Sequence, residues 1–105
     1  MTQSKLRAIC GLRVSDADLT VRDAGLRFEN GATLSVYNNF VVTGISGAGT
    51  ALVGKTVAEV NEDTDTVKIT FSGGVELRID MRDGAYNGPE AMQLRMPGES
   101  IVVWN

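Results

Sequence analysis

Apolar and polar residues alternate along most of this chain, with the period of two that a strand with one buried face requires. The alternation covers the segments 25–29, 33–36, 56–60, 67–71, 76–81 and 92–96. Its phase changes near Ser15 and Asp16, where a β-bulge restores the inward face. Because these segments are short and separated by turn residues, we expect an all-β protein with about eight short antiparallel strands.

One pattern occurs twice, at 11–36 and at 54–79, with a constant offset of 43 residues. The matched positions are Gly11/Gly54, Val14/Val57, Asp16/Glu59, Ala17/Val60, Leu26/Ile69, Phe28/Phe71, Gly31/Gly74, Leu34/Leu77 and Val36/Ile79. This agreement predicts two pseudo-symmetric three-stranded repeats, neither of which buries enough surface to be stable alone. Together with a C-terminal hairpin they predict a sandwich or a partly open barrel.

The turns and ends of the chain complete this expectation. Asn30-Gly31 and Gly73-Gly74 favour type I′ hairpin turns, which need positive φ at both central positions. Residues 4–10 have apolar positions at helical spacing and predict a short N-terminal helix or turn that covers one end of the core. The glycine-rich stretch 43–50 is typical of a flexible connection.

The C-terminal strand at 101–104 is apolar on both faces, so we expect it to be central or covered. It also contains Trp104, one of several aromatic residues outside the alternating core positions. Tyr37, Phe40 and Tyr86 are the others. Each could plug an open end of the core or anchor a protein contact at the surface, as tyrosine and tryptophan often do. For Trp104 the pattern favours the core.

Length and composition indicate one folded domain spanning residues 1–105. The chain is 43% apolar and 22% charged, the profile of a globular protein. Its longest apolar runs, 40–42 and 101–104, are far shorter than a membrane helix. Lys5 and Arg7 interrupt the N-terminus where a secretory signal needs an apolar segment, so we expect a cytoplasmic protein.

The residue types of most catalytic sites are missing. The sequence has no histidine, which removes the commonest general base and most transition-metal sites. Its one cysteine, Cys10, has no thiol or imidazole partner and is expected to be a small buried residue. Residues 61–72 lack most ligands of a calcium loop, and 44–50 lacks the lysine of a phosphate-binding loop. We expect no enzyme activity, no metal and no cofactor.

Negative charge is concentrated in one stretch. Four acids, Glu59, Glu62, Asp63 and Asp65, fall within seven residues that contain no base. The net charge is −3, with 13 acids and 10 bases. Without these four, 13 − 4 = 9 acids would stand against the 10 bases, so all the net negative charge lies in this stretch. The stretch is either a solvated hairpin tip or an acidic surface that attracts a basic partner. Direct nucleic-acid binding is disfavoured because no basic face is present.

Several segments resemble small single-domain bacterial β proteins of unknown function. These are Gly54-Lys55-Thr56-Val57, the Gly-Gly hairpin, Gly88-Pro89-Glu90-Ala91 and Ile101-Val102-Val103-Trp104. Proteins of this kind are encoded as immunity proteins beside polymorphic or contact-dependent growth inhibition toxins. The resemblance implies a non-catalytic inhibitor of a cognate toxin, such as a nuclease, and transfers no site residue.

Combined with charge and exposure, the sequence nominates seven partner-binding residues: Glu59, Glu62, Asp63, Asp65, Tyr37, Phe40 and Tyr86. Two other functions remain open. The chain could be a self-assembling module, for example a homodimer that pairs through the edge near 37–42. It could also be a small-ligand carrier with a cavity near Phe71, Met92 and Met96.

Overall fold

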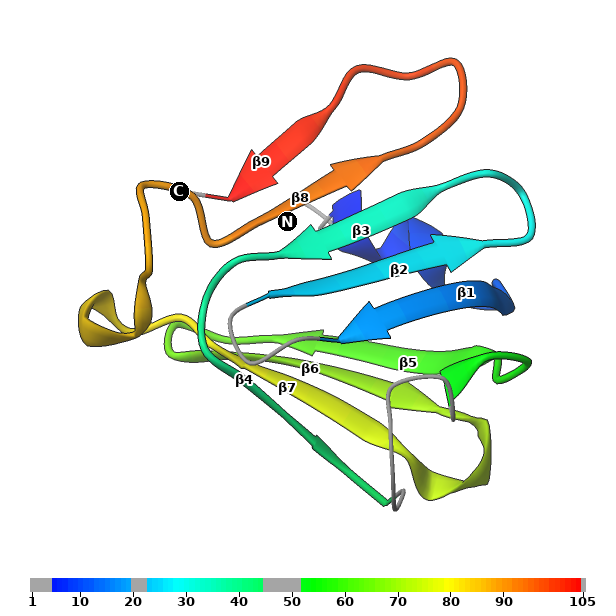
Figure 1. Ribbon diagram of the computed structural model, residues 1–105, viewed down its shortest axis with the longest axis horizontal. Coiled ribbons are helices and arrows are strands. Elements are labelled where there is room, and N and C mark those ends of the chain that lie inside the picture. Colours follow the sequence, from blue (N-terminus) through cyan, green and yellow to red (C-terminus); the bar gives the residue numbers. More distant parts are fainter. Residues whose placement is uncertain (1–4, 20–22, 45–51, 105) are drawn as a thin grey trace.

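The computed structural model describes residues 5–19, 23–44 and 52–104, which form nine strands in two antiparallel sheets (Figure 1). The five-stranded sheet has the order β1-β2-β3-β8-β9, with β1 Val14–Leu19, β2 Ala24–Phe28, β3 Thr33–Val36, β8 Met92–Arg95 and β9 Val102–Trp104. The four-stranded sheet has the order β4-β7-β6-β5, with β4 Phe40–Thr43, β5 Val57–Glu62, β6 Thr66–Phe71 and β7 Glu76–Asp80. The expected all-β class is confirmed.

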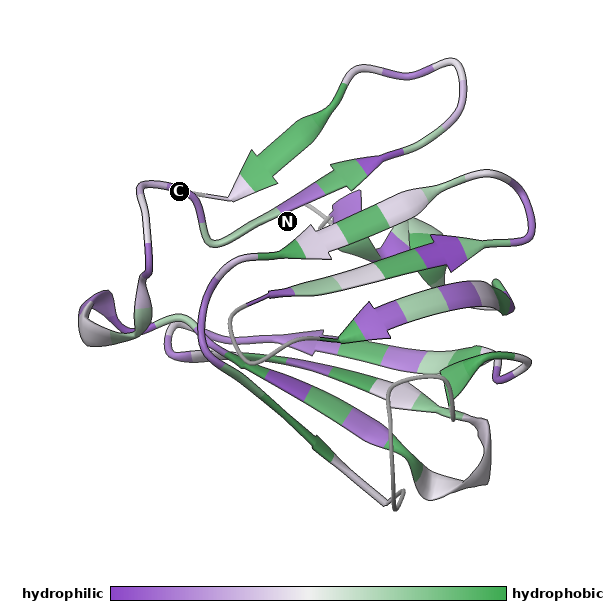
Figure 2. Cartoon of the chain, viewed as in Figure 1, coloured by the Kyte–Doolittle hydropathy of each residue, from purple (hydrophilic) through white to green (hydrophobic). Residues whose placement is uncertain are grey.

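The core lies between the inner faces of the two sheets. Inward side chains alternate with outward ones along β2, β3, β6 and β7, as the bands of hydropathy in Figure 2 show. Phe28 and Phe71 are each 1% exposed and are among the largest buried side chains. This is the inside-outside alternation that the sequence predicted, and it positions the outward residues that form the surface.

The two sheets exchange strands. After β3 the chain crosses to the other sheet, where β4 pairs with β7. After β7 it crosses back, and β8 pairs with β3. The sheets are also joined where β1 and β5 begin, by an isolated antiparallel bridge between Arg13 and Thr56. The molecule is therefore a sandwich of two open sheets and not a closed barrel.

The bulge expected near Ser15 and Asp16 is confirmed, because the β1–β2 register shifts between Val14 and Asp16. A second register shift lies between Val57 and Glu59 in the β5–β6 ladder. The type I′ turn at Asn30-Gly31 is wrong, since Gly31 has a φ of +90° while no described residue other than glycine has positive φ. The Asn30 side chain explains this: its Oδ1 accepts a hydrogen bond from Ala32 N at 2.9 Å and so favours an ordinary Asx turn.

The number of strands and the place of the last one also need correction. The described residues hold nine strands where we expected about eight, because 40–43 forms a strand of its own. Strand β9 lies at an edge, neither central nor covered, since it pairs only with β8. Its outward side is apolar but open, with Ile101 43% and Val103 37% exposed. Trp104 is partly buried and packs against the core.

The N-terminal element is the 3-10 helix η1, Lys5–Ile9, which buries Leu6 and Ile9 completely. Cys10 is exposed and not buried as expected, because it occupies the turn after η1, where its N–H donates to Arg7 O at 3.1 Å.

The expected flexible connection at 43–50 lies mostly outside the described residues. Within those residues, no helix has the length and apolar character needed to cross a membrane.

Candidate functional site

Three segments meet at one end of the sandwich, which we call the crossover end: residues 37–39, 63–65 and 81–91 (Figure 1). Backbone hydrogen bonds join them. Asp80 N donates to Asn39 O at 3.0 Å, Asn39 N donates to Ala85 O at 3.1 Å, and Met81 N donates to Asp65 O at 2.8 Å. The first segment connects β3 to β4, the second is the β5–β6 turn, and the third connects β7 to β8 and contains the 3-10 helix η4, Asp83–Ala85.

The crossover end is negatively charged. Its three segments contain four acids, Asp63, Asp65, Asp83 and Glu90, and one base, Arg82. Arg82 is itself paired with Asp80, the last residue of β7, at 2.6 Å. A basic partner that approached this end would therefore meet an attractive field.

The four acids predicted as a patch are all exposed, but they differ in what they do. Asp63 holds the β5–β6 turn, since its Oδ1 accepts hydrogen bonds from Asp65 N at 2.9 Å and Thr66 N at 2.8 Å. Glu59 lies farther along β5, where its Oε1 accepts from Asn61 Nδ2 at 2.7 Å. Glu62 ends β5. Only Asp63 and Asp65 belong to the crossover end.

The predicted aromatic residues also gather here. Tyr37 and Tyr86 lie within the crossover end and Phe40 follows it, and all three are half-buried. Phe40 packs against the core, as Trp104 does at the C-terminus. Tyr37 and Phe40 border two separate surface hollows. The sequence-nominated residues do not form a single site, since Glu59 and Glu62 lie on β5 outside the crossover end.

The first hollow, about 340 Å³ in volume, lies beside the edge strand β4, and we call it the β4 hollow. Its lining includes Phe40, Val41, Asp65, Arg78, Asp80 and Arg82. Val41 is 59% exposed, the largest exposed fraction among the described large hydrophobic residues. This hollow places an apolar edge next to the acidic turn, which is a combination suited to protein contacts.

The surroundings of Asp80 change the pKa of its carboxyl group. Its carboxylate accepts hydrogen bonds from Arg82 Nη2 at 2.6 Å and from Arg82 Nε at 3.0 Å. These bonds to the charged form, together with one from the Arg82 backbone N–H, lower the pKa of Asp80 to about 2. The same pair raises the pKa of Arg82.

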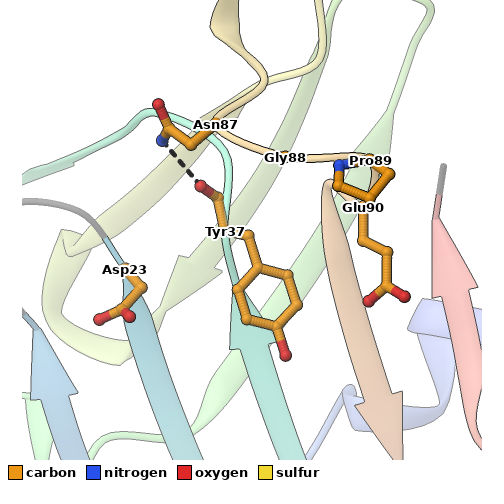
Figure 3. A pocket seen from close by; sticks show the side chains of 6 residues that line it. All are labelled: Asp23, Tyr37, Asn87, Gly88, Pro89 and Glu90. Carbon is orange, nitrogen blue, oxygen red and sulfur yellow. Dashed lines mark hydrogen bonds between the residues drawn. The ribbon is translucent and has the colours of Figure 1, made fainter.

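The second hollow, about 290 Å³ in volume, surrounds Tyr37 and is lined also by Asp23, Asn87, Gly88, Pro89 and Glu90 (Figure 3). We call it the Tyr37 hollow. In this view the tyrosine ring stands between the carboxylates of Asp23 and Glu90. Sequence reasoning named only Tyr37 here. Asp23 could have been found from the strand register alone. Ala24 pairs with Val36, and this pairing puts Asp23 beside Tyr37.

Two basic side chains lie near the centre of the outer face of the four-stranded sheet. Lys68 on β6 lies opposite Arg78 on β7 in the strand register. Both form ion pairs with Glu76, Lys68 Nζ at 4.0 Å and Arg78 Nη2 at 2.9 Å. In the part of the chain that the structure describes, no group of three or more His, Cys, Asp or Glu is placed to hold a metal ion.

Comparison with protein-family models, with curated proteins and with solved structures found no match to this chain.

Proposed function

We propose that this protein works by binding a basic protein partner at the crossover end. One observation carries the proposal: the acidic β5–β6 turn is held rigid by Asp63 and lies next to a hollow bordered by Phe40 and the exposed Val41. Opposite charge speeds the encounter of two proteins, and buried apolar contacts slow their separation. A rigid acidic turn beside an apolar edge offers both.

The specific form of this proposal is an immunity protein that neutralises a cognate bacterial toxin in the cytoplasm, without catalysis. A nuclease toxin suits it well, because a cleft that binds nucleic acid is basic. The crossover end would occupy that cleft or cover its mouth. The resemblance of the framework segments to immunity-type β proteins supports this form, and the acidic end supports the choice of a basic target.

Charge reversal at the crossover end tests the proposal. The variant Asp65→Lys/Asp83→Lys changes two exposed acids and leaves Asp63, whose side chain holds the β5–β6 turn, in place. The control Glu29→Lys/Glu99→Lys makes the same change of net charge on exposed positions of the β2–β3 and β8–β9 turns. Both variants should remain folded, because exposed substitutions change stability little.

The measurement is capture from a lysate of the native host, followed by association kinetics with the purified partner. A basic protein should be retained by wild type and by the control but not by the crossover-end variant. Its association rate with the variant should fall by about tenfold or more at low salt and by less at high salt. Co-expression of the wild-type protein should restore growth of cells that express the partner. Equal capture by all three proteins would overturn the proposal.

A self-assembling homodimer is the second candidate, and the open edges of the sheets favour it. Strand β4 carries Val41, and the C-terminal segment with β9 carries Ile101 and Val103, all exposed. An exposed apolar edge strand can pair with another copy. If this function is correct, light scattering should show a dimer that dissociates in a Val41→Lys or Val103→Lys variant. A monomer at all concentrations would exclude it.

We further propose that the two halves of the chain are pseudo-symmetric repeats. Backbone bonds related by the offset of 43 residues support this. Gly11 N donates to Val57 O and Gly54 N donates to Val14 O, both at 2.8 Å, and the bridge between Arg13 and Thr56 joins two equivalent positions. Both register shifts also fall at equivalent places, before Asp16 and before Glu59.

A further inference from the structure

We propose that the Tyr37 hollow binds one arginine side chain of a protein partner. This site lies within the crossover end but is separate from the β4 hollow. It rests on the proposed function, because both take the partner to be a basic protein. The inference depends on how the fold holds Tyr37, on the two carboxylates beside its ring, and on the size of the hollow.

The backbone fixes the position of Tyr37. Its N–H donates to Ala91 O at 2.9 Å, and its carbonyl accepts a hydrogen bond from Asn87 Nδ2 at 2.9 Å. Val36 and Asn38 on either side of it are fully buried, so the tyrosine side chain points outward between them. The backbone that carries the ring is thus already in place and needs little ordering when a ligand arrives, which reduces the entropic cost of binding.

Two carboxylates flank this ring from neighbouring strands. Asp23 precedes β2 and lies beside Tyr37 in the β2–β3 register, and Glu90 precedes Ala91 on the other side. Figure 3 shows Glu90 and the tyrosine ring extending in the same direction. Among the described residues, no lysine or arginine lines the hollow. Negative charge on two sides of an aromatic ring selects a cation.

The geometry favours a guanidinium group over other cations. A guanidinium is planar, stacks on an aromatic ring and can form two parallel hydrogen bonds with one carboxylate, whereas an ammonium is a point charge with stronger hydration. The volume of about 290 Å³ is below the usual range for cofactor sites and suits a single side chain. In our assignment the guanidinium stacks on Tyr37 and bonds to Glu90.

Nuclear magnetic resonance with small probes tests this directly. The ¹⁵N-labelled full chain is titrated with Nα-acetyl-arginine amide, and separately with the citrulline analogue, which keeps the shape but lacks the charge. The lysine analogue is the third probe. We expect saturable shift changes with the arginine probe, confined to the amides of Asp23 and Tyr37 and of the non-proline residues in 87–91. The changes should be weaker with the lysine probe and absent with the citrulline probe.

Variants make the assignment specific. Tyr37→Leu removes the aromatic ring, and Glu90→Gln removes one charge with little change of shape; each should weaken binding of the arginine probe about tenfold. Tyr37→Phe should retain binding because the ring remains. Glu99→Gln, an equal loss of charge at an exposed residue of the β8–β9 turn, should have no effect. The spectrum of each variant also reports whether it is folded.

Four results would overturn the inference: no saturable binding of the arginine probe, equal binding of the citrulline probe, tighter binding of the lysine probe, or unchanged affinity in both the Tyr37→Leu and Glu90→Gln variants. Its failure can be told apart from failure of the proposed function. If the arginine probe does not bind but Asp65→Lys/Asp83→Lys still loses a basic partner, the crossover end remains the docking surface. If the arginine probe binds and the Asp65→Lys/Asp83→Lys variant captures the partner as well as wild type does, the acidic docking surface is excluded and only binding at the Tyr37 hollow is supported.

Discussion

At the scale of single residues, the pair formed by Asp80 and Arg82 controls the end of β7. Arg82 follows Asp80 by only two positions, yet its guanidinium and its backbone N–H both bond to the Asp80 carboxylate. These bonds direct the chain out of β7. They also let the charges of Asp80 and Arg82 neutralise each other. The pair also borders the β4 hollow, so its protonation state affects the proposed docking surface.

The titration of Asp80 is the first prediction. Because its folded-state pKa is about 2 against an ordinary value of 3.8, the pair stabilises the fold above pH 3.8 and loses this contribution as the pH falls through about 2. Carbon-detected resonance of the Asp80 carboxyl should show the low pKa. In the variant Arg82→Met it should return towards 3.8, and a wild-type Asp80 that already titrates near 3.8 would contradict the prediction.

At the scale of elements, Gly44 determines how β4 ends against the β6–β7 turn. Gly44 has a φ of +87°, and a Cβ at this position would lie 2.6 Å from Gly74 O and 3.1 Å from Val75 Cα. These neighbours are backbone atoms, which cannot move aside as a flexible side chain can. The edge strand therefore requires glycine here for its conformation and for space.

The second prediction concerns Gly44→Ala and Gly98→Ala, two variants at positions that both have positive φ. Gly98 in the β8–β9 turn has a φ of +78°, and a Cβ there would meet no described atom within 4 Å, so Gly98→Ala should cost about 1–2 kcal/mol of unfolding free energy. Gly44→Ala adds a clash and should cost about 1–3 kcal/mol more. Denaturant unfolding measures both. Equal losses would mean that β4 moves away from Gly74 at little cost.

The sequence predicted those elements that alternate cleanly and are bounded by turn residues. Strands β2, β3, β6 and β7 have strict alternation, and the structure confirms them. Strand β4 was not recognised as separate, because Phe40–Thr43 is apolar at three successive positions and gives no phase. The type I′ turn at Asn30-Gly31 failed because a side-chain hydrogen bond of Asn30 determines that turn. At the second predicted turn, Gly73 and Gly74 both have the positive φ that type I′ geometry needs.

The candidate site was harder to predict, because it depends on contacts between distant segments. Tyr37 meets Glu90 only because β8 returns to pair with β3, and a linear pattern does not contain that crossing. Asn38 shows the same limitation. It is fully buried and its Nδ2 donates to Asp80 O at 2.9 Å, a bond across 42 positions that no local pattern indicates. The acidic turn, by contrast, was visible because its residues are adjacent in sequence.

At the scale of the whole molecule, neither half of the chain contains a complete sheet. The first half provides β1, β2 and β3 to one sheet but sends β4 to the other. The second half provides β5, β6 and β7 and returns β8 and β9. Each half therefore leaves an open edge on its own three strands, which only a strand from the other half can cover.

The third prediction follows from this exchange. Fragments 1–47 and 48–105, produced separately, should each lack the dispersed amide spectrum of a folded protein, because the three strands that each contributes to its own sheet leave their inner face uncovered. Mixed or expressed together, they should associate and recover the spectrum of the intact chain. A fragment 1–47 that folds alone and as a monomer would contradict the prediction.

The exchange of β4 and β8 also has a consequence during synthesis on the ribosome. The edge of β3 pairs with β8, so the first sheet cannot be finished until β8 has left the exit tunnel. Until then, nascent chains on the same messenger carry bare strand edges within reach of one another. Translation speed and chaperone supply should therefore influence the yield of this protein.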